Sequence, residues 1–445
     1  MNWVITKLMN ILKNIAKNNI INNNFLKEEI LYTKQKVEKM KKTILLLLVF
    51  LLFSILLNSQ TVDEYFAKGV KKSKLGDFKG AIIDFNKAIE IEPNHSDIYY
   101  NRGIAKFNLG DNKGAIQDFN KVIKMDPNDL DAYINRGNAK DTSGDNSGAI
   151  QDFSKAIEIN PKCSEAYINR GTNKSILGDK LGAIADFDKG IEINPKVSIA
   201  YNNRGNVKTE LGEYTDAIED YNKAIEIDPN DFYGYYNRGN VKVDLEDFTG
   251  AIHDYNKAIE LNANNADIYK SRGNVKAVLK NFNEAIVDYD SAIKINPNLV
   301  LAYFNRGNVK GELGKKREAI EDYSKAIDLN INYAEAYHNR GLEKVDIGDY
   351  KGGIEDFNKA INLNPKNDFA FFSRGNAKSL IFDYRGAIED FNKAIELNPN
   401  VGESYANRGL SKVKLKNYKG ACSDWEIAVE LGNLEASDYI KQYCK

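Results

Sequence analysis

The sequence is poor in the residues that build most metal centres and nucleophilic active sites. Cysteine and histidine are few and scattered, occurring as Cys163, Cys422, Cys444, His95, His253 and His338. No two of them stand at the spacing of a metal-binding pair or share a catalytic motif. The sequence also lacks a glycine-rich phosphate loop behind a strand pattern. We therefore predict no metal, no cofactor and no catalytic residue.

The sequence also lacks an excess of either charge. Lysine and arginine total 62 and aspartate and glutamate total 63, which leaves a net charge of -1. A chain with this balance has no overall positive field to hold the phosphates of a nucleic acid by counterion release. The balanced composition therefore predicts no nucleic-acid partner.

Long hydrophobic runs are rare, and a single one interrupts the otherwise polar N-terminal part. It covers fourteen residues from Ile44 to Leu57, follows Lys41-Lys42 and precedes Asn58-Ser59-Gln60. This order is typical of a secretory signal peptide, although the cleavage region is poor, so an uncleaved membrane anchor is the alternative. Residues 40–60 thus predict an extracytoplasmic protein that is periplasmic, secreted or membrane-anchored.

Residues 1–39 form a poorly defined N-terminal extension rich in Asn, Lys and Ile. A signal peptide should begin at its own initiator, and Met40 could supply it, which makes a misassigned start one interpretation. The other is a basic amphipathic segment that lies on a membrane surface. Its apolar side would consist of Trp3, Ile5, Leu8, Leu12 and Ile15.

From residue 62 to residue 433 the sequence repeats without insertion every 34 residues. The eleven repeats begin at residues 62, 96, 130, 164, 198, 232, 266, 300, 334, 368 and 402. Each contains two stretches of about a dozen residues with helical apolar spacing, separated by a turn. All eight prolines follow the second stretch, where a residue without an N–H ends a helix at little cost. Each repeat therefore predicts a helical hairpin.

Three kinds of residue recur inside every hairpin. Glycine stands in the middle of the first helix, from Gly69 to Gly409, and a small residue follows twelve positions later, from Ala81 to Ala421. We expect the two helices to approach closely there. One aromatic residue recurs on each helix, in columns running from Tyr65 to Tyr405 and from Phe85 to Trp425. Their regular recurrence indicates core packing.

These glycine, alanine, aromatic and proline positions resemble those of the tetratricopeptide repeat family over residues 62–433. The resemblance implies an all-α fold, a right-handed superhelical solenoid of eleven 34-residue helix-turn-helix repeats, with a capping helix over residues 434–445. The chain departs from the family where Arg, or Lys68 in the first repeat, replaces the usual Leu before glycine. Lys likewise replaces a common Tyr three residues after glycine.

Both departures accompany an aspartate on the second helix, from Asp84 in the first repeat to Asp424 in the last. We predict ion pairs between the two helices of every hairpin, repeated as a network. A catalytic role for these carboxylates is disfavoured because a reactive site would occur once and not in every repeat.

Asparagines recur beside the Arg-Gly pair, giving Asn-Arg-Gly repeats. In the family this part of the first helix lines a concave groove, and a similar asparagine ladder occurs in eukaryotic O-linked N-acetylglucosamine transferases. An amide offers both a donor and an acceptor to the backbone of an extended peptide. Alternatively, the asparagines cap or bridge neighbouring first helices. These ladder asparagines are Asn101, Asn135, Asn169, Asn203, Asn237, Asn305, Asn339 and Asn407 before arginine, and Asn138, Asn206, Asn240, Asn274, Asn308 and Asn376 after glycine.

The sequence can also be compared with the carboxylate clamp found in Hsp90 and Hsp70 co-chaperones, which binds the C-terminal carboxylate of a peptide. Lys270, Asn274 and Asn305 match three of its five residues, whereas Glu335 and Asn339 occupy the other two positions. A negative charge in place of a required positive one would repel a carboxylate. We therefore predict that no such clamp is present.

The C-terminal residues 434–445 predict a short amphipathic helix that covers the end of the array. Cys422 and Cys444 could form a disulfide that fastens this helix, or both could be free thiols. Together these features predict a non-enzymatic scaffold that binds an extended peptide or a partner protein along an Asn-lined groove. The alternative is a structural or self-assembling envelope solenoid without a peptide ligand.

Overall fold

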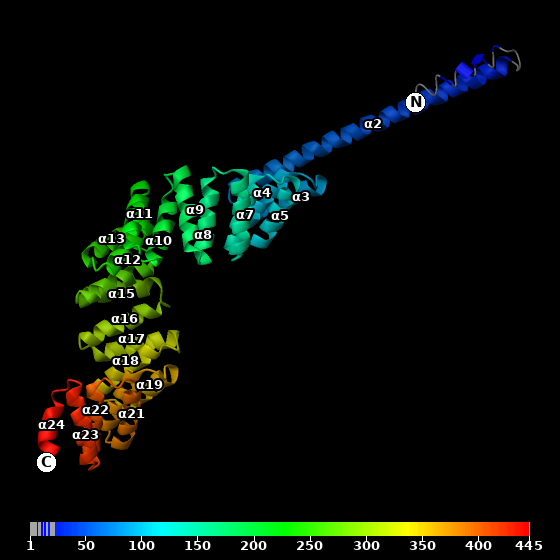
Figure 1. Cartoon of the computed structure of the whole chain (residues 1–445). Coiled ribbons are helices and arrows are strands. Elements are labelled where there is room, and N and C mark those ends of the chain that lie inside the picture. The colour runs from blue at the N-terminus through cyan, green and yellow to red at the C-terminus, as the bar shows by residue number, and fades with distance from the viewer. Residues whose placement is uncertain (1–6, 8–9, 12, 15–16, 18–22, 445) are drawn as a thin grey trace. The chain divides into compact units, whose positions relative to one another are not determined.

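The computed structural model describes residues 7, 10–11, 13–14, 17 and 23–444, and every regular element among them is a helix (Figure 1). The chain divides into two compact units, residues 1–193 and residues 194–445. The apolar residues of the predicted N-terminal amphipathic segment, from Trp3 to Ile15, lie outside the described residues.

The first unit begins with one long helix, α2, which is followed by seven shorter helices, α3 to α9. Its helices are α2 (Asn23–Lys74), α3 (Phe78–Ile91), α4 (Ser96–Asn108), α5 (Asn112–Met125), α6 (Leu130–Thr142), α7 (Asn146–Ile159), α8 (Ser164–Ile176) and α9 (Lys180–Ile193). The last part of α2 is the first helix of the first repeat, so this unit holds repeats one to four.

The second unit holds repeats five to eleven and a terminal helix. Its helices are α10 (Ser198–Glu210), α11 (Tyr214–Ile227), α12 (Phe232–Asp244), α13 (Phe248–Leu261), α14 (Ala266–Val278), α15 (Phe282–Ile295), α16 (Val300–Glu312), α17 (Lys316–Leu329), α18 (Ala334–Asp346), α19 (Tyr350–Leu363), α20 (Asp368–Leu380), α21 (Tyr384–Leu397), α22 (Gly402–Lys414), α23 (Tyr418–Glu430) and α24 (Ala436–Tyr443). Within each unit, every hairpin packs against the next. The predicted all-α repeat fold is confirmed.

The turn within each hairpin is defined by a left-handed residue followed by an N-cap. In the first repeat Gly76 has φ +80°, and the Asp77 carboxylate then accepts a hydrogen bond from the Gly80 N–H. Glycine adopts this conformation without a Cβ clash. Four repeats place another residue there, namely Glu246, Lys280, Phe382 and Lys416, with φ between 60° and 68°.

Alanines and the second-helix aromatic column make up much of the core. Phe85 and its counterparts in the other repeats are at most 2% exposed. A Cβ placed on Gly69 would lie 2.5 Å from the Phe85 ring, and one on Gly353 would lie 3.0 Å from the Gly341 carbonyl oxygen. The first-helix glycines are therefore required mainly by the aromatic rings, while the small residues let the backbones approach.

The C-terminal end is closed by α24. Trp425, fully buried, donates from Nε1 to the Ala406 carbonyl, and its ring lies 5.3 Å from Tyr439 and 5.7 Å from Tyr443 between centroids. A disulfide joins Cys422 on α23 to Cys444 just after α24. The terminal helix is thus held by both an aromatic cluster and a covalent bond.

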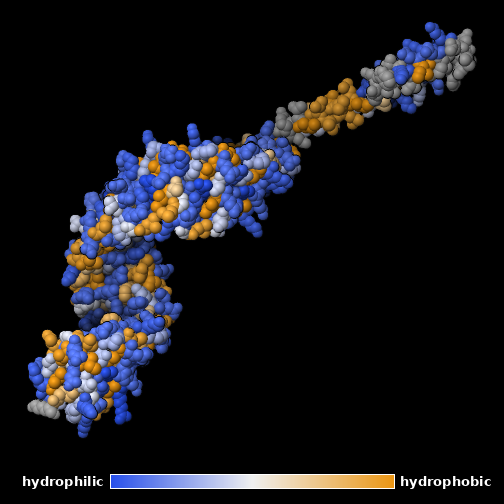
Figure 2. Space-filling model, viewed as in Figure 1, coloured by the Kyte–Doolittle hydropathy of each residue, from blue (hydrophilic) through white to orange (hydrophobic). Residues whose placement is uncertain are grey.

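The hydrophobic run of residues 44–57 lies within α2, where the side chains from Leu45 to Ile55 form an exposed apolar band (Figure 2). Fourteen helical residues extend about 21 Å, less than the ~30 Å apolar core of a bilayer. Among the described residues, no helix combines the length and apolar character needed to cross a membrane. The predicted extracytoplasmic location through this segment is therefore wrong.

Candidate functional site

The charged residues around the glycines pair with the second-helix aspartate of their hairpin, as predicted, except that Lys68 in the first repeat pairs with Glu64 on its own helix and leaves Asp84 to Lys72. In the seventh repeat the Asp288 carboxylate accepts from Arg272 Nε at 2.9 Å and Nη2 at 2.6 Å, and Lys276 Nζ lies 3.0 Å away. Asp288 is only 1% exposed. The same arginine–aspartate pair recurs in repeats two to eleven at 2.5 to 2.7 Å. The predicted network of ion pairs is confirmed.

Each of these arginines also connects to its surroundings in two further ways. Arg272 Nη1 donates to the Asn256 Oδ1 of the preceding repeat at 2.5 Å, and its guanidinium lies 5.6 Å from the centre of the Tyr269 ring. The hydrogen bond to Asn256 joins consecutive repeats, while the buried carboxylate and the cation–π pair hold the arginine within its own hairpin. The charges of this network are therefore part of the scaffold.

The ladder asparagines lie on the first helices, and many of them bond to one another across repeat boundaries. The amide of the residue before arginine donates to the carbonyl of the residue after glycine in the preceding repeat. These bridges, defined here as ladder bridges, are Asn169–Asn138 (3.0 Å), Asn237–Asn206 (3.0 Å), Asn305–Asn274 (2.8 Å), Asn339–Asn308 (2.9 Å) and Asn407–Asn376 (2.9 Å).

The other ladder asparagines have different surroundings. Asn101 donates to the Asp97 carbonyl, and Asn135 donates to the Asp131 carbonyl and the Tyr100 hydroxyl. Asn203 is half-buried on α10, and Asn240 accepts from the Tyr255 hydroxyl. The structure therefore joins ten of the predicted residues in ladder bridges, while Asn101, Asn135 and Asn240 make the other contacts given above.

Sequence reasoning missed one set of partners of the ladder. Tyrosines of the second-helix aromatic column donate to the carbonyl of the asparagine after glycine: Tyr221 to Asn206, Tyr255 to Asn240, Tyr289 to Asn274 and Tyr323 to Asn308, at 2.8 to 2.9 Å. The sequence did contain a sign of this contact: the second-helix aromatic column changes from Phe to Tyr in four repeats, and all four also carry the asparagine after glycine.

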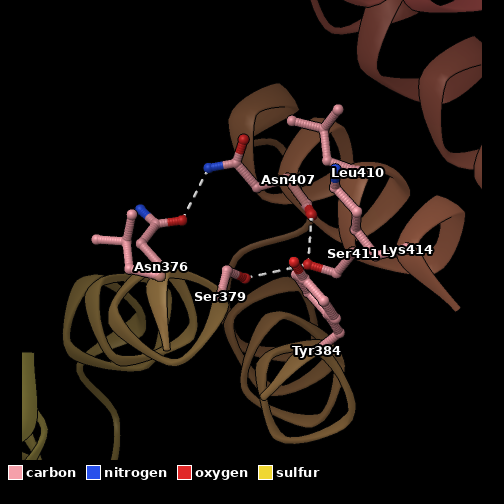
Figure 3. Close-up of a pocket in the computed structure, with 8 residues that line it drawn as sticks. Asn376, Ser379, Tyr384, Asn407, Leu410, Ser411 and Lys414 are labelled. Atoms are coloured by element: carbon pink, nitrogen blue, oxygen red, sulfur yellow. Dashed lines mark hydrogen bonds between the residues drawn. The ribbon is translucent and has the colours of Figure 1, made fainter. Parts of the chain in front are cut away.

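Open hollows lie beside the ladder in the second unit. One of about 230 Å³ lies between repeats six and seven; its wall includes Asn240, Asn274 and Ser271, and its apolar lining includes Val243 and Val278. Another of about 410 Å³ lies between repeats ten and eleven (Figure 3). There the Asn376–Asn407 bridge stands above Ser379 and Ser411, with Leu410 at the edge.

The boundary between repeats eight and nine carries a charged residue where most repeats have a small apolar one. Glu343 occupies a position that is Ala or Val in most repeats, and a Cβ on Gly311 would lie 2.4 Å from its Oε1. Lys316 Nζ is 3.6 Å from Glu343 and also pairs with Asp346. Burial raises the pKa of Glu343 and lowers that of the neighbouring His338.

The described residues can also be compared with a metal site and with the carboxylate clamp. No group of three or more His, Cys, Asp or Glu side chains among them is arranged to hold a metal ion. Lys270, which matched one residue of a carboxylate clamp, pairs with Asp267 at 2.6 Å, and Asn274 is bound by Asn305 and Tyr289. Glu335 is exposed on α18.

The hairpin array and its paired helices define a helical-repeat solenoid. Family profiles described as TPR repeat or tetratricopeptide repeat match most of residues 73–401, at 73–110, 96–129, 130–163, 164–197, 205–245, 239–280, 273–314, 300–333, 334–367 and 370–401. The chain belongs to the tetratricopeptide repeat family. Repeats of this family form scaffolds for interactions between proteins.

Several solved structures are similar to the chain. YrrB, described as a TPR protein with an unusual peptide-binding site, is 28% identical, with 41% of this chain and 95% of YrrB covered and a TM-score of 0.37. MamA is 26% identical over 37% of this chain and 96% of its own, with a TM-score of 0.35. A tetratricopeptide repeat protein from Parabacteroides merdae is 21% identical over 56% and 99%, with a TM-score of 0.47. No curated protein sequence matches the chain.

Proposed function

We propose that the chain is a non-enzymatic scaffold that holds an extended segment of a partner protein along the ladder asparagines. The observation that carries this proposal is the row of ladder bridges beside open hollows with partly apolar walls. Amides can bind the peptide backbone of the partner, and the hollows can accept some of its side chains.

Each ladder bridge keeps hydrogen-bonding capacity for a ligand. An asparagine amide has two N–H donors and a carbonyl with two lone pairs. The bridge from Asn305 to Asn274 uses one donor of Asn305 and one lone pair of Asn274. The Asn305 carbonyl and the Asn274 amino group can then pair with one peptide unit, which needs one acceptor and one donor.

The array itself argues that ladder bridges are not needed for stacking. At the boundary between repeats nine and ten, Leu342 and Ser373 occupy the two ladder positions, and the helices α18 to α21 have the same lengths and spacing as elsewhere. Since asparagine is a poor residue for a helix interior, its recurrence favours a role beyond stacking.

The proposal is tested by selecting a displayed library of random, unstructured peptides on the full chain and measuring the affinity of the best binder. We expect the double variant Asn237→Ala/Asn305→Ala to bind that peptide about tenfold or more weakly, because each lost contact to a ligand backbone weakens binding. The matched control is Asn283→Ala, an exposed asparagine on the second helix of repeat seven.

Unchanged affinity in the double variant, with intact helical content, would show that the ladder is structural only. If the chain selects no peptide and its mass in solution rises with concentration, the self-assembling alternative replaces the scaffold.

A further inference from the structure

The second-helix aromatic column changes its chemistry in the middle of the array. It consists of Phe85, Phe119, Phe153 and Phe187 in repeats one to four, and of Phe357, Phe391 and Trp425 in repeats nine to eleven. In repeats five to eight it consists of Tyr221, Tyr255, Tyr289 and Tyr323. These tyrosines are as buried as the phenylalanines, at 1% to 2% exposure. The rings pack alike, so the core does not need the hydroxyls.

A buried hydroxyl is costly unless it is hydrogen-bonded. In all four repeats it donates to the carbonyl of the asparagine after glycine, at 2.8 to 2.9 Å. Every repeat with this tyrosine has that asparagine, whereas Asn138 and Asn376 occur above phenylalanine. Tyrosine is therefore present only where the carbonyl of a ladder amide can accept a hydrogen bond from its hydroxyl.

The hydroxyl fixes which way the ladder amide faces. The Asn274 carbonyl accepts from Tyr289 on its own hairpin and from Asn305 on the next repeat. Asn206 and Asn308 accept from Tyr221 and Tyr323 and from the following repeat in the same way. Two donors occupy the two lone pairs of each carbonyl. The amino group must then face away from the tyrosine. A ladder bridge above phenylalanine lacks this constraint, because its two amides can exchange donor and acceptor roles.

We propose that Tyr221, Tyr255, Tyr289 and Tyr323 are positioning residues that set the ladder amides of repeats five to eight for binding one kind of ligand, an extended polypeptide backbone. The inference rests on the proposed function and narrows it to this stretch. The amino groups of Asn206, Asn240, Asn274 and Asn308 donate to carbonyl oxygens of the ligand. The preset orientation removes a rotational cost that binding would otherwise include.

The experiment uses the full chain and the peptide selected from the random library, together with a copy of that peptide in which alternate backbone amides are replaced by esters. An ester has a weaker acceptor carbonyl and no N–H, so the wild type should bind the ester copy less well. In the triple variant Tyr255→Phe/Tyr289→Phe/Tyr323→Phe, we expect affinity for the amide peptide to fall about tenfold. We also expect the preference for amide over ester to shrink. A purely structural role would lower the melting temperature and leave this preference unchanged.

The matched control is Tyr303→Phe, which removes the hydroxyl of a buried first-helix tyrosine that stacks on Arg306. It should bind both peptides as the wild type does. A gain is expected from Phe391→Tyr, which places a hydroxyl below the Asn376–Asn407 bridge. A longer peptide that reaches repeat ten should then bind more tightly.

Two failures are distinguishable. If the asparagine variants weaken binding while the triple tyrosine variant keeps both the wild-type affinity and the wild-type amide preference, the positioning role is overturned and the scaffold stands. If the wild type selects no peptide, the proposed function fails and the inference fails with it.

Discussion

Removing the carboxylate of Asp288 should destabilise the seventh repeat strongly. Asp288 is 1% exposed and receives two hydrogen bonds from Arg272 and a third contact from Lys276. In Asp288→Ala the arginine loses its counter-charge and the lysine keeps only Glu284, 3.4 Å away, while 16% of the arginine and 13% of the lysine side chain face solvent. Breaking a buried pair from one side costs ~3 to 5 kcal/mol, and partial solvation of the cations favours the lower end, about 3 kcal/mol.

The assay is urea unfolding followed by circular dichroism, combined with amide hydrogen exchange. Stability in a repeat array is the sum of local terms, so the loss should concentrate in α14 and α15 and their immediate neighbours. The control is Asp267→Ala in the same repeat, whose carboxylate is 54% exposed and pairs with Lys270. That pair should contribute at most ~1 kcal/mol. Equal losses in the two variants would refute the structural account of the network.

Three further outcomes follow from particular contacts. Burial lowers the pKa of His338 below 6.5, so the unfolded chain binds the proton at a higher pH than the folded chain does. The stability that the neutral imidazole allows is therefore full above pH 6.5 and falls as the pH drops below it. His338→Phe should reduce the drop in urea midpoint between pH 7.5 and pH 5.5. Phe382 is 78% exposed with φ 68°, and Phe382→Gly should raise stability by about 1 kcal/mol in urea unfolding; a decrease would show that the ring packs usefully. Cys444→Ser should speed hydrogen exchange in α24 and cost ~2 to 4 kcal/mol of its local stability, whereas exchange as slow as in the wild type would mean that the Trp425 cluster alone holds the helix.

Much of the fold was predictable because each repeat presents the same local code. The apolar spacing, the proline and the turn glycine specify a hairpin, and eleven copies in phase specify a stack. The pairing of Arg272 with Asp288 was predictable for the same reason, since both departures from the family pattern occur together in every repeat.

The partners of the ladder could not be predicted from spacing alone. Asn274 and Asn305 are 31 residues apart, and their contact depends on how closely consecutive hairpins stack. The role of Tyr289 depends on which edge of its ring meets the first helix, beside Gly273. The hydrophobic run of residues 44–57 misled the prediction of location because basic residues precede it and polar residues follow it, as in a signal peptide. Its length nevertheless falls short of a membrane span.

The central claim is that the ladder side of the first helices holds the partner, and site-specific photocrosslinking tests it most directly. Val278 and Val287 are both 62% exposed in repeat seven; Val278 lines the hollow beside Asn274, and Val287 lies on the second helix, α15. With a photoreactive phenylalanine at either position, we predict that the selected peptide crosslinks through residue 278 and not through residue 287. Crosslinking through residue 287 alone, with the peptide bound at wild-type affinity, would contradict the account.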